Sequence, residues 1–159
     1  GGFFLNNEMD DFRAKPGVSN QFGLLGAEAN AIEPQKRMLS SMTPTIVERD
    51  GQLFMVLGAP GGSTIITAVF QVITNVVDFG LPMEEAVHAG RFHHQWLPDE
   101  ILVERGALPD STMAQLKAMG HSFREIERMA VIKAILKDRS GTLHAVGDFR
   151  NPDDDARGY

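Results

Sequence analysis

The sequence predicts an α+β fold in which helices pack against an antiparallel sheet. Strand-like segments occur in neighbouring pairs, while the helical segments between them come in consecutive blocks, an order typical of this class. The composition is that of an ordinary globular protein, with 43% hydrophobic and 23% charged residues. A chain of 159 residues fits one domain, so we expect a single domain over residues 1–159.

Two predicted hairpins frame the regular part of the chain. Residues 45–49 and 52–57 flank Asp50-Gly51, a strong signal for a two-residue hairpin turn. The second segment is continuously apolar from residue 53 to 57, so we expect both of its faces to be covered. Residues 131–137 and 142–146 predict a closing hairpin, and residues 101–104 a short strand between the two pairs.

Three helices are expected between the strands. The first begins at Ser63 or Thr64, either of which can cap it, and ends before Gly80. Its apolar residues cover most of its circumference, which predicts burial between layers; they are Ile65, Ile66, Val69, Phe70, Ile73, Val76 and Val77. Pro82 opens the second helix, and the third spans residues 110–119, with Met113, Leu116 and Met119 expected to face inward.

Composition excludes several classes of function. The net charge of −6 leaves no basic surface for nucleic acid, and no apolar run approaches the roughly 20 residues that span a bilayer. Without cysteine there is no disulfide and no thiol nucleophile. Residues 1–44 are irregular, as in a binding or lid region or a disordered one, and the start at Gly1 leads us to expect a piece of a longer protein.

Two segments of the irregular region carry groups suited to an amino acid's charges. Glu8, Asp10 and Asp11 suit a cation such as an ammonium group, although a solvated acidic loop is the alternative. The hydroxyls of Ser40 and Ser41 can donate to a carboxylate, or else form local turns with the backbone.

A third segment offers backbone donors. Gly61 and Gly62 precede the first helix, where consecutive N–H groups beside its positive end suit an anion or a developing oxyanion. A tight connection that needs no side chain is the alternative. The segment lacks the lysine of a phosphate loop and does not match a dinucleotide-binding fingerprint.

The remaining polar clusters predict structural roles. His93 and His94 are adjacent, so in an extended segment they point to opposite faces and make a poor metal pair. We expect a packed loop to which Phe92 and Trp96 contribute apolar area, and a solvated surface at residues 153–155. No cofactor and no metal is expected, and the spacing supplies no nucleophile.

Four motifs in order resemble the small subunit of γ-glutamyltranspeptidase, and the resemblance runs from Gly2 to Tyr159. These motifs are Asn6-Asn7-Glu8-Met9-Asp10-Asp11-Phe12, the segment 36–45 around Ser40-Ser41, Gly58-Ala59-Pro60-Gly61-Gly62-Ser63, and Arg91-Phe92-His93-His94-Gln95-Trp96-Leu97-Pro98. The resemblance implies the αββα sandwich of the N-terminal-nucleophile hydrolases, here partial, with the first strands upstream of Gly1.

Substrate-binding roles follow from the resemblance. Glu8 and Asp11 match the residues that hold the α-ammonium of the γ-glutamyl substrate. Ser40 and Ser41 match the hydroxyls that bind its α-carboxylate. Residues 16–27 correspond to a lid loop over the pocket, with Phe22 where many members place an aromatic lid residue.

Catalytic roles follow in the same way. Gly61 and Gly62 match the pair whose N–H groups form the oxyanion hole. The family's nucleophile is a Thr exposed by self-cleavage of a proenzyme, and here it would lie upstream of Gly1, so this chain alone is expected to be inactive. Smaller departures from the family are Met38, where Pro is usual, and residues 147–150, where Ser-Asp-Pro-Arg is common.

The resemblance implies that the complete enzyme transfers the γ-glutamyl group of glutathione or related amides to water or amino acids. A large subunit of the same proenzyme would be its partner, and its location would be periplasmic or secreted. Two alternatives stay open: a cephalosporin or glutaryl acylase of the same fold, and a non-catalytic fragment or binding module.

Overall fold

The computed structural model describes residues 2–3 and 5–158. Gly1, where the sequence predicts an upstream extension, and Tyr159, where the family resemblance ends, lie outside the described residues. By its internal contacts the chain divides into two compact units, Gly1–Ser41 and Met42–Tyr159, where the sequence predicted one domain. Each unit is described by itself.

The first unit is mostly irregular, as its Gly- and Asn-rich sequence predicts. It contains two short 3₁₀ helices, η1 (Glu8–Asp11) and η2 (Glu28–Asn30). A single bridge pairs Arg13 with Ala31 and closes the long loop between these helices. Phe12 is buried, so the unit has a small apolar centre beside η1.

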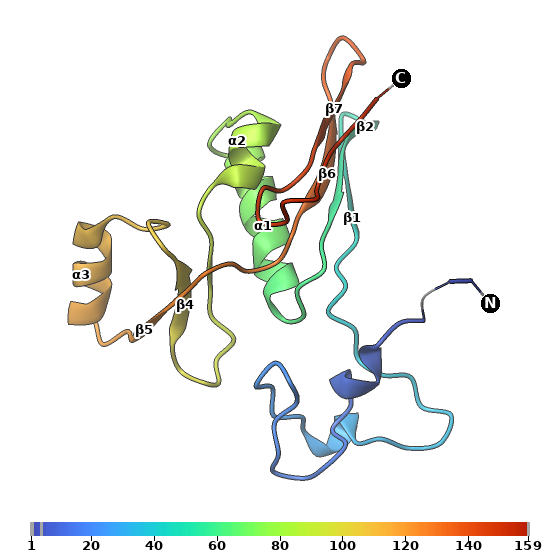
Figure 1. Cartoon of the computed structure of the whole chain (residues 1–159), viewed down its shortest axis with the longest axis vertical. Helices are drawn as coiled ribbons and strands as arrows, with labels where there is room; N and C mark the ends of the chain where they lie inside the picture. Colours follow the sequence, from blue (N-terminus) through green and yellow to red (C-terminus); the bar gives the residue numbers. More distant parts are fainter. Residues whose placement is uncertain (1, 4, 159) are drawn as a thin grey trace. The chain divides into compact units, whose positions relative to one another are not determined.

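The second unit is built on a four-stranded antiparallel sheet (Figure 1). Its order is β1-β2-β6-β7, formed by β1 (Thr45–Arg49), β2 (Gln52–Gly58), β6 (Lys133–Lys137) and β7 (Leu143–Val146). Both predicted hairpins are therefore confirmed. Asp50 and Gly51 have φ angles of 55° and 72°, the left-handed conformation that a tight hairpin turn of the primed type requires.

Helices α1 (Thr64–Val77) and α2 (Met83–His88) pack on one face of this sheet (Figure 1). The core between them is apolar and includes Met55, Leu57, Val69, Val72, Val87 and Ile132. Pro82 precedes α2 as predicted, because its fixed φ suits a helix start and its missing N–H costs nothing there. In the described part of the chain, every helix lacks the length and apolar character needed to cross a bilayer.

Two burial predictions for this layer are wrong. Along β2, Met55 and Leu57 are buried, but Leu53 and Val56 are 42% and 38% exposed. Side chains alternate between the faces of a strand, and in the described second unit α1 and α2 cover one face of this sheet. In α1, likewise, Phe70 is 66% and Ile66 52% exposed, so this helix is not buried between two layers in the described second unit.

A second sheet contains β3 (Phe92–His93), β4 (Ile101–Glu104) and β5 (Phe123–Ile126). β4 and β5 are parallel and are connected through α3 (Asp110–Ala118), so the expectation of purely antiparallel pairing is wrong here. The short strands β3 and β5 were not predicted. In α3, Met113 and Leu116 are half-buried, whereas Met119, directly after the helix, is 74% exposed. The expected inward face is therefore wrong for Met119.

Candidate functional site

The acidic helix η1 and the two serines lie together in the first unit. The Ser40 hydroxyl donates a 2.5 Å hydrogen bond to Oε1 of Glu8. The structure therefore brings together a carboxylate suited to an ammonium group and a hydroxyl suited to a carboxylate. This is the combination that an α-amino acid needs, because its ammonium and carboxylate groups are bonded to the same carbon.

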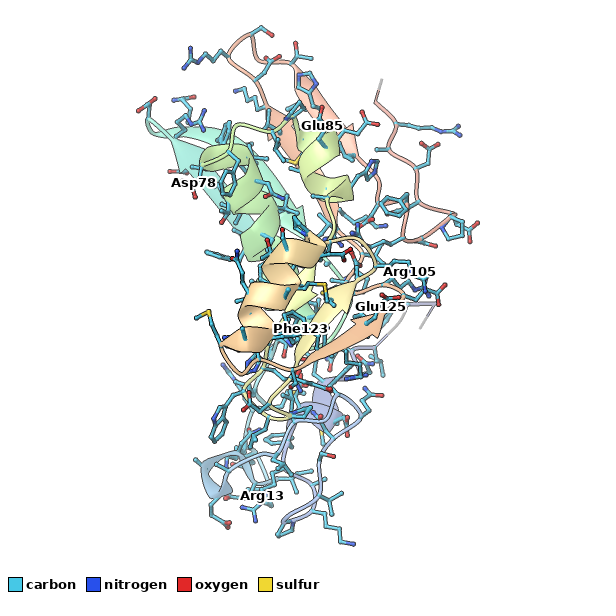
Figure 2. The ribbon with its side chains drawn as sticks, turned by 90° about the vertical axis from the view of Figure 1, so that its left-hand side faces the viewer. Arg13, Asp78, Glu85, Arg105, Phe123 and Glu125 are labelled. Atoms are coloured by element: carbon cyan, nitrogen blue, oxygen red, sulfur yellow. The ribbon has the colours of Figure 1, made fainter. Side chains whose placement is uncertain are left out.

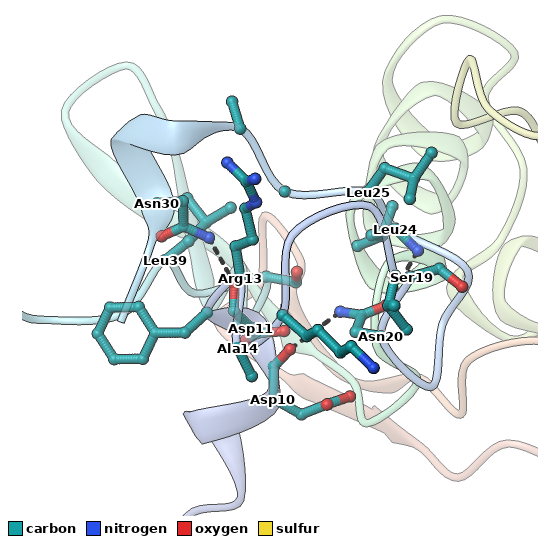
Figure 3. Close-up of a pocket in the computed structure, with 16 residues that line it drawn as sticks. Asp10, Asp11, Arg13, Ala14, Ser19, Asn20, Leu24, Leu25, Asn30 and Leu39 are labelled. Carbon is teal, nitrogen blue, oxygen red and sulfur yellow. Dashed lines mark hydrogen bonds between the residues drawn. The ribbon is translucent and has the colours of Figure 1, made fainter. Parts of the chain in front are cut away.

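A cavity of about 320 Å³ opens beside η1, and both Asp11 and Ser41 line it (Figure 3). Asn30 fixes the backbone here by donating from Nδ2 to the carbonyl of Asp11 at 2.6 Å. Partial burial raises the pKa of the Asp11 carboxyl, and the negative charges of Glu8 and Asp10 raise it further. An arriving cation would relieve this repulsion, which makes the cluster receptive to positive charge.

The predicted lid loop, residues 16–27, is held to η1 through Asp10. Asn20 donates from Nδ2 to the Asp10 carbonyl at 3.1 Å, and the N–H of Gln21 donates to Asp10 Oδ2 at 3.0 Å. The side-chain oxygen of Asn20 also accepts from the N–H groups of Phe22 and Leu24, both at 3.0 Å, which shapes the tip of the loop. Leu24 lines the cavity, and Phe22 is 36% exposed at the tip.

Arg13 closes the base of this loop and was not singled out from the sequence. It pairs with Glu28 at 2.6 Å and its backbone N–H donates to the Asn30 carbonyl at 2.9 Å. A Cβ on Gly26 would lie 2.7 Å from that of Arg13, so only glycine fits this close approach. Arg13 therefore joins the two ends of the loop and also lines the cavity.

In the second unit, Gly61 and Gly62 form the turn that leads into α1. Their φ angles are +148° and +58°, in the region that favours glycine. An added Cβ on Gly61 would lie 2.7 Å from the Cα of Ala130, so backbone packs directly on this turn. A turn at a helix start can present backbone N–H groups to an oxyanion, and this role of Gly61 and Gly62 stays a prediction.

The first turn of α1 differs from the prediction in one detail. Ser63 makes no capping hydrogen bond; its hydroxyl donates instead to Oε1 of Gln95 at 2.8 Å. Thr64 Oγ1 donates to the Gly61 carbonyl at 2.8 Å. The hydroxyls beside the turn are thus used to fix its backbone and to join it to the segment after β3.

The histidine pair lies on opposite faces, as the extended backbone predicts. His93 is buried, with Nδ1 2.8 Å from the Thr67 hydroxyl, whereas His94 is exposed and lies 3.1 Å from Asp99. The expectation of a packed loop is wrong for both aromatic residues, because Phe92 is 43% and Trp96 77% exposed. Among residues 2–3 and 5–158, no group of three or more His, Asp or Glu side chains is arranged to hold a metal ion.

A buried cluster of four charged side chains in the second unit was missed. Arg91 contacts Asp148 at 2.9 Å, while Arg150 contacts Glu104 at 2.5 Å and Asp148 at 3.1 Å. In the sequence, residues 147–150, which include Asp148 and Arg150, stand out only as a departure from a family pattern. One sequence signal could have indicated this cluster, namely a charged residue in apolar surroundings. Glu104, at the end of the strand Ile101–Glu104, is such a residue.

Electrostatics keep this cluster ionised. Burial opposes the charge of Asp148, but N–H donors and the Arg91 guanidinium hold its pKa below the ordinary value. Burial likewise opposes the charge of Glu104, but the Arg150 guanidinium and the N–H groups of Met129 and Arg91 together lower its pKa below the ordinary value. Burial and the neighbouring charge of Arg150 lower the pKa of Arg91 from its very high ordinary value. The four side chains therefore form a charge-balanced unit inside the protein.

Residues 153–155, the acidic run after this cluster, were expected to form a solvated surface. This expectation is wrong for Asp154. Asp154 is largely buried, pairs with Lys133 and accepts from the N–H of Asp148 at 3.0 Å. The hydrogen bond from Lys133 lowers the pKa of Asp154, and that from the Asp148 N–H lowers it further. Asp154 thus attaches the C-terminal segment to β6.

The comparisons with known proteins now decide the family. The family model described as Gamma-glutamyltranspeptidase matches residues 1–158. The chain belongs to the gamma-glutamyltranspeptidase family. It is 51% identical over 158 residues to the glutathione hydrolase proenzyme of Escherichia coli, covering 99% of this chain and 27% of that protein.

Solved gamma-glutamyltranspeptidases share the fold. The T380A mutant of the Helicobacter pylori enzyme superposes with a TM-score of 0.87 at 48% identity, over 94% of this chain and 82% of that one. The enzyme of Pseudomonas nitroreducens, solved in complex with L-DON, gives 0.83 at 51% identity, over 99% and 80%. The chain therefore has the N-terminal-nucleophile hydrolase fold of this family, and it spans about a quarter of the length of the E. coli proenzyme.

Proposed function

We propose that the protein containing this chain is a γ-glutamyltransferase and glutathione hydrolase. It would cleave γ-glutamyl amides such as glutathione and pass the γ-glutamyl group to water, amino acids or peptides. The observation that carries this proposal is the pairing of Ser40 with Glu8 beside the cavity lined by Asp11 and Ser41. Carboxylates there suit the α-ammonium of the substrate, and hydroxyls suit its α-carboxylate.

The chemistry proceeds through a covalent intermediate on a Thr that lies in a segment outside this chain. Its hydroxyl attacks the γ-carbonyl, its own α-amine takes the proton, and the leaving amine departs with that proton. Water or an amino acid then attacks the acyl-enzyme and regenerates the Thr. The N–H groups of Gly61 and Gly62 stabilise the negative charge on the carbonyl oxygen in both steps. This chain alone is inactive because it contributes no nucleophile.

The complete fold in this proposal is an αββα sandwich whose remaining strands come from outside this chain. One row of aligned residues on the uncovered face of the four-stranded sheet supports it: Ile46, Val56 and Ile135 pair across β1, β2 and β6, and all three are exposed. An exposed apolar row of this kind is normally covered by another layer. A large subunit of the same proenzyme is the proposed partner, and the proposed location is periplasmic or secreted.

The deciding experiment compares two substrates in the full-length protein. Asp11→Asn removes a charge that contacts the α-ammonium, so KM for a γ-glutamyl anilide should rise by about 10- to 100-fold, the value of a charge-assisted hydrogen bond. A glutaryl anilide lacks that ammonium, and its KM should not respond to the substitution. Asp153→Asn, an exposed acidic residue in the other unit, is the matched control.

The possible results separate the alternatives. Preference for glutaryl over γ-glutamyl amides would contradict the proposal and indicate an acylase of the same fold. A full-length protein that acts on neither substrate would indicate a non-catalytic binding module. Equal effects of Asp11→Asn on both substrates would remove Asp11 from the ammonium site.

A further inference from the structure

One short segment connects the buried charged cluster to the Gly61–Gly62 turn. This segment, residues 129–132, runs without regular secondary structure into β6. Four of its backbone groups bind the cluster. The N–H of Met129 donates to Glu104 Oε1 at 2.9 Å, and the N–H of Ile132 donates to Asp148 Oδ2 at 2.8 Å. The carbonyls of Met129 and Ala130 accept from Arg91 Nη1 at 3.4 and 2.8 Å. The cluster therefore fixes both ends of the segment and its centre.

Another N–H of the segment binds the turn itself. Val131 donates to the carbonyl of Pro60 at 3.1 Å, directly before Gly61. Ala130 lies against Gly61 so closely that a Cβ there would be 2.7 Å from its Cα. Ala130 also has a φ of +26°, an unusual value for a residue with a side chain, so it is held in place by its surroundings.

Burying four charged side chains costs free energy, which indicates that the cluster serves to fix the position of the backbone around it. A buried ion pair is weak evidence for stability, because apolar residues of similar volume often stabilise a fold as well or better. What apolar residues cannot do is bind the N–H and carbonyl groups of segment 129–132. Arg91 and Asp148, whose side chains are 1% and 0% exposed, form hydrogen bonds with these backbone groups and an ion pair with each other.

We infer that Arg91, Glu104, Asp148 and Arg150 are positioning residues that hold the Gly61–Gly62 turn in the geometry needed for acyl transfer, an inference that rests on the function proposed above. Arg150 holds the two carboxylates in place, because it forms ion pairs with Glu104 and Asp148. It is itself fixed by the bonds that it donates to the carbonyls of Val87 and Ala89. The other three contact segment 129–132 directly.

The test uses Asp148→Asn in the full-length protein. Asp148 accepts at both oxygens, at Oδ2 from Arg91 and the Ile132 N–H and at Oδ1 from the N–H and Nη1 of Arg150. Asparagine keeps the shape but can accept at only one of these two positions. Activity is expressed per processed active site, so that loss of self-cleavage does not count as loss of chemistry. A turn moved out of place should lower kcat by about 10- to 100-fold. KM for the γ-glutamyl anilide should stay within about twofold, because transition-state contacts alone are affected.

Two matched variants complete the design. Glu125→Gln breaks the exposed pair that Arg105 and Glu125 form at 2.8 Å in the same unit (Figure 2), and it should leave kcat and KM unchanged. Ala130→Gly keeps the cluster and removes only the methyl group packed on Gly61. It should lower kcat several-fold at constant KM, and it serves as the test if Asp148→Asn does not fold.

Hydrogen exchange supplies a readout that does not depend on activity. Peptides covering residues 60–63 and 129–132 should exchange faster in Asp148→Asn, while the rest of the four-stranded sheet keeps its protection. Unchanged exchange in these peptides, or an unchanged kcat in both folded variants, would overturn the inference. A wild-type protein without γ-glutamyl transfer would instead refute the proposed function, and the exchange data would still decide whether the cluster positions the turn.

Discussion

Ser40 and Glu8, 32 residues apart in the sequence, share a 2.5 Å hydrogen bond. Donor and acceptor roles are complementary here, because the hydroxyl donates and the carboxylate accepts. A bound amino acid would redistribute these bonds. Its ammonium group would donate to the Glu8 carboxylate, and its own carboxylate would accept from the Ser40 hydroxyl. In the proposed function, substrate binding at this pair would form two charge-assisted hydrogen bonds in place of the one between Ser40 and Glu8.

This exchange predicts that Ser40 and Glu8 are energetically coupled. Ser40→Ala and Glu8→Gln should each lower kcat/KM for a γ-glutamyl amide, while the double variant should lower it by less than the product of the two effects. A double-mutant cycle on kcat/KM should give a coupling of about 0.5–3 kcal/mol, as expected for residues in direct contact. Strict additivity would show that the two side chains act independently.

Asp11 should give substrate binding a pH dependence that begins at unusually high pH for a carboxylate. Its pKa is raised above the ordinary value of 3.8 by burial and by Glu8 and Asp10. The ammonium needs the ionised form, so KM should rise as the pH falls through this raised pKa. Asp10→Asn removes one of the two neighbouring negative charges and should shift the profile to lower pH. A profile that does not move would exclude electrostatic coupling between these carboxylates.

The loop 16–27 should become more mobile when its attachment to Asp10 is lost. Asn20→Ala removes the bonds from Nδ2 to Asp10 and from Oδ1 to the N–H groups of Phe22 and Leu24. Hydrogen exchange at these two N–H groups should accelerate by about tenfold, since each bond contributes about 1 kcal/mol. Gln21→Ala keeps its backbone bond to Asp10 and should show little change, so similar effects in both variants would contradict the role of Asn20.

Gly61 should tolerate no side chain. Gly61→Ala would place a Cβ 2.7 Å from the Ala130 Cα at a φ of +148°, so either the turn or segment 129–132 must move. We expect destabilisation of more than about 2 kcal/mol in thermal unfolding, with a loss of kcat in the protein that folds. Gly106→Ala is the matched control, because its φ of +75° is also positive but no atom lies within 4 Å. It should cost only the conformational strain.

The buried carboxylates predict how stability depends on pH. The pKa of Asp148 lies below its ordinary 3.8 and that of Glu104 below its ordinary 4.5. Their contribution to stability is therefore fully present above these ordinary values and is lost as the pH falls through the lower folded-state pKa values. Urea unfolding between about pH 3 and pH 7 should show this decline, and Asp148→Asn should flatten it. An unchanged slope in the variant would exclude Asp148 as one of its sources.

Some elements were predictable because their signal is local. Asp50-Gly51 defines a hairpin turn by its own backbone preference, and Pro82 marks a helix start for the same kind of reason. The second sheet was less accessible. Strand β3 has two residues and β5 has four, so neither presents enough alternation to be recognised, and their pairing depends on β4 from elsewhere in the chain.

The sequence by itself determined the family, because carboxylates, hydroxyls and paired glycines in four ordered motifs identify it. Only the tertiary structure decided what holds those groups in place. Ser40 reaches Glu8, Asn20 reaches Asp10, and Arg91 reaches Asp148 across 57 residues of chain. Such contacts have no sequence period, since they depend on where distant segments meet after folding.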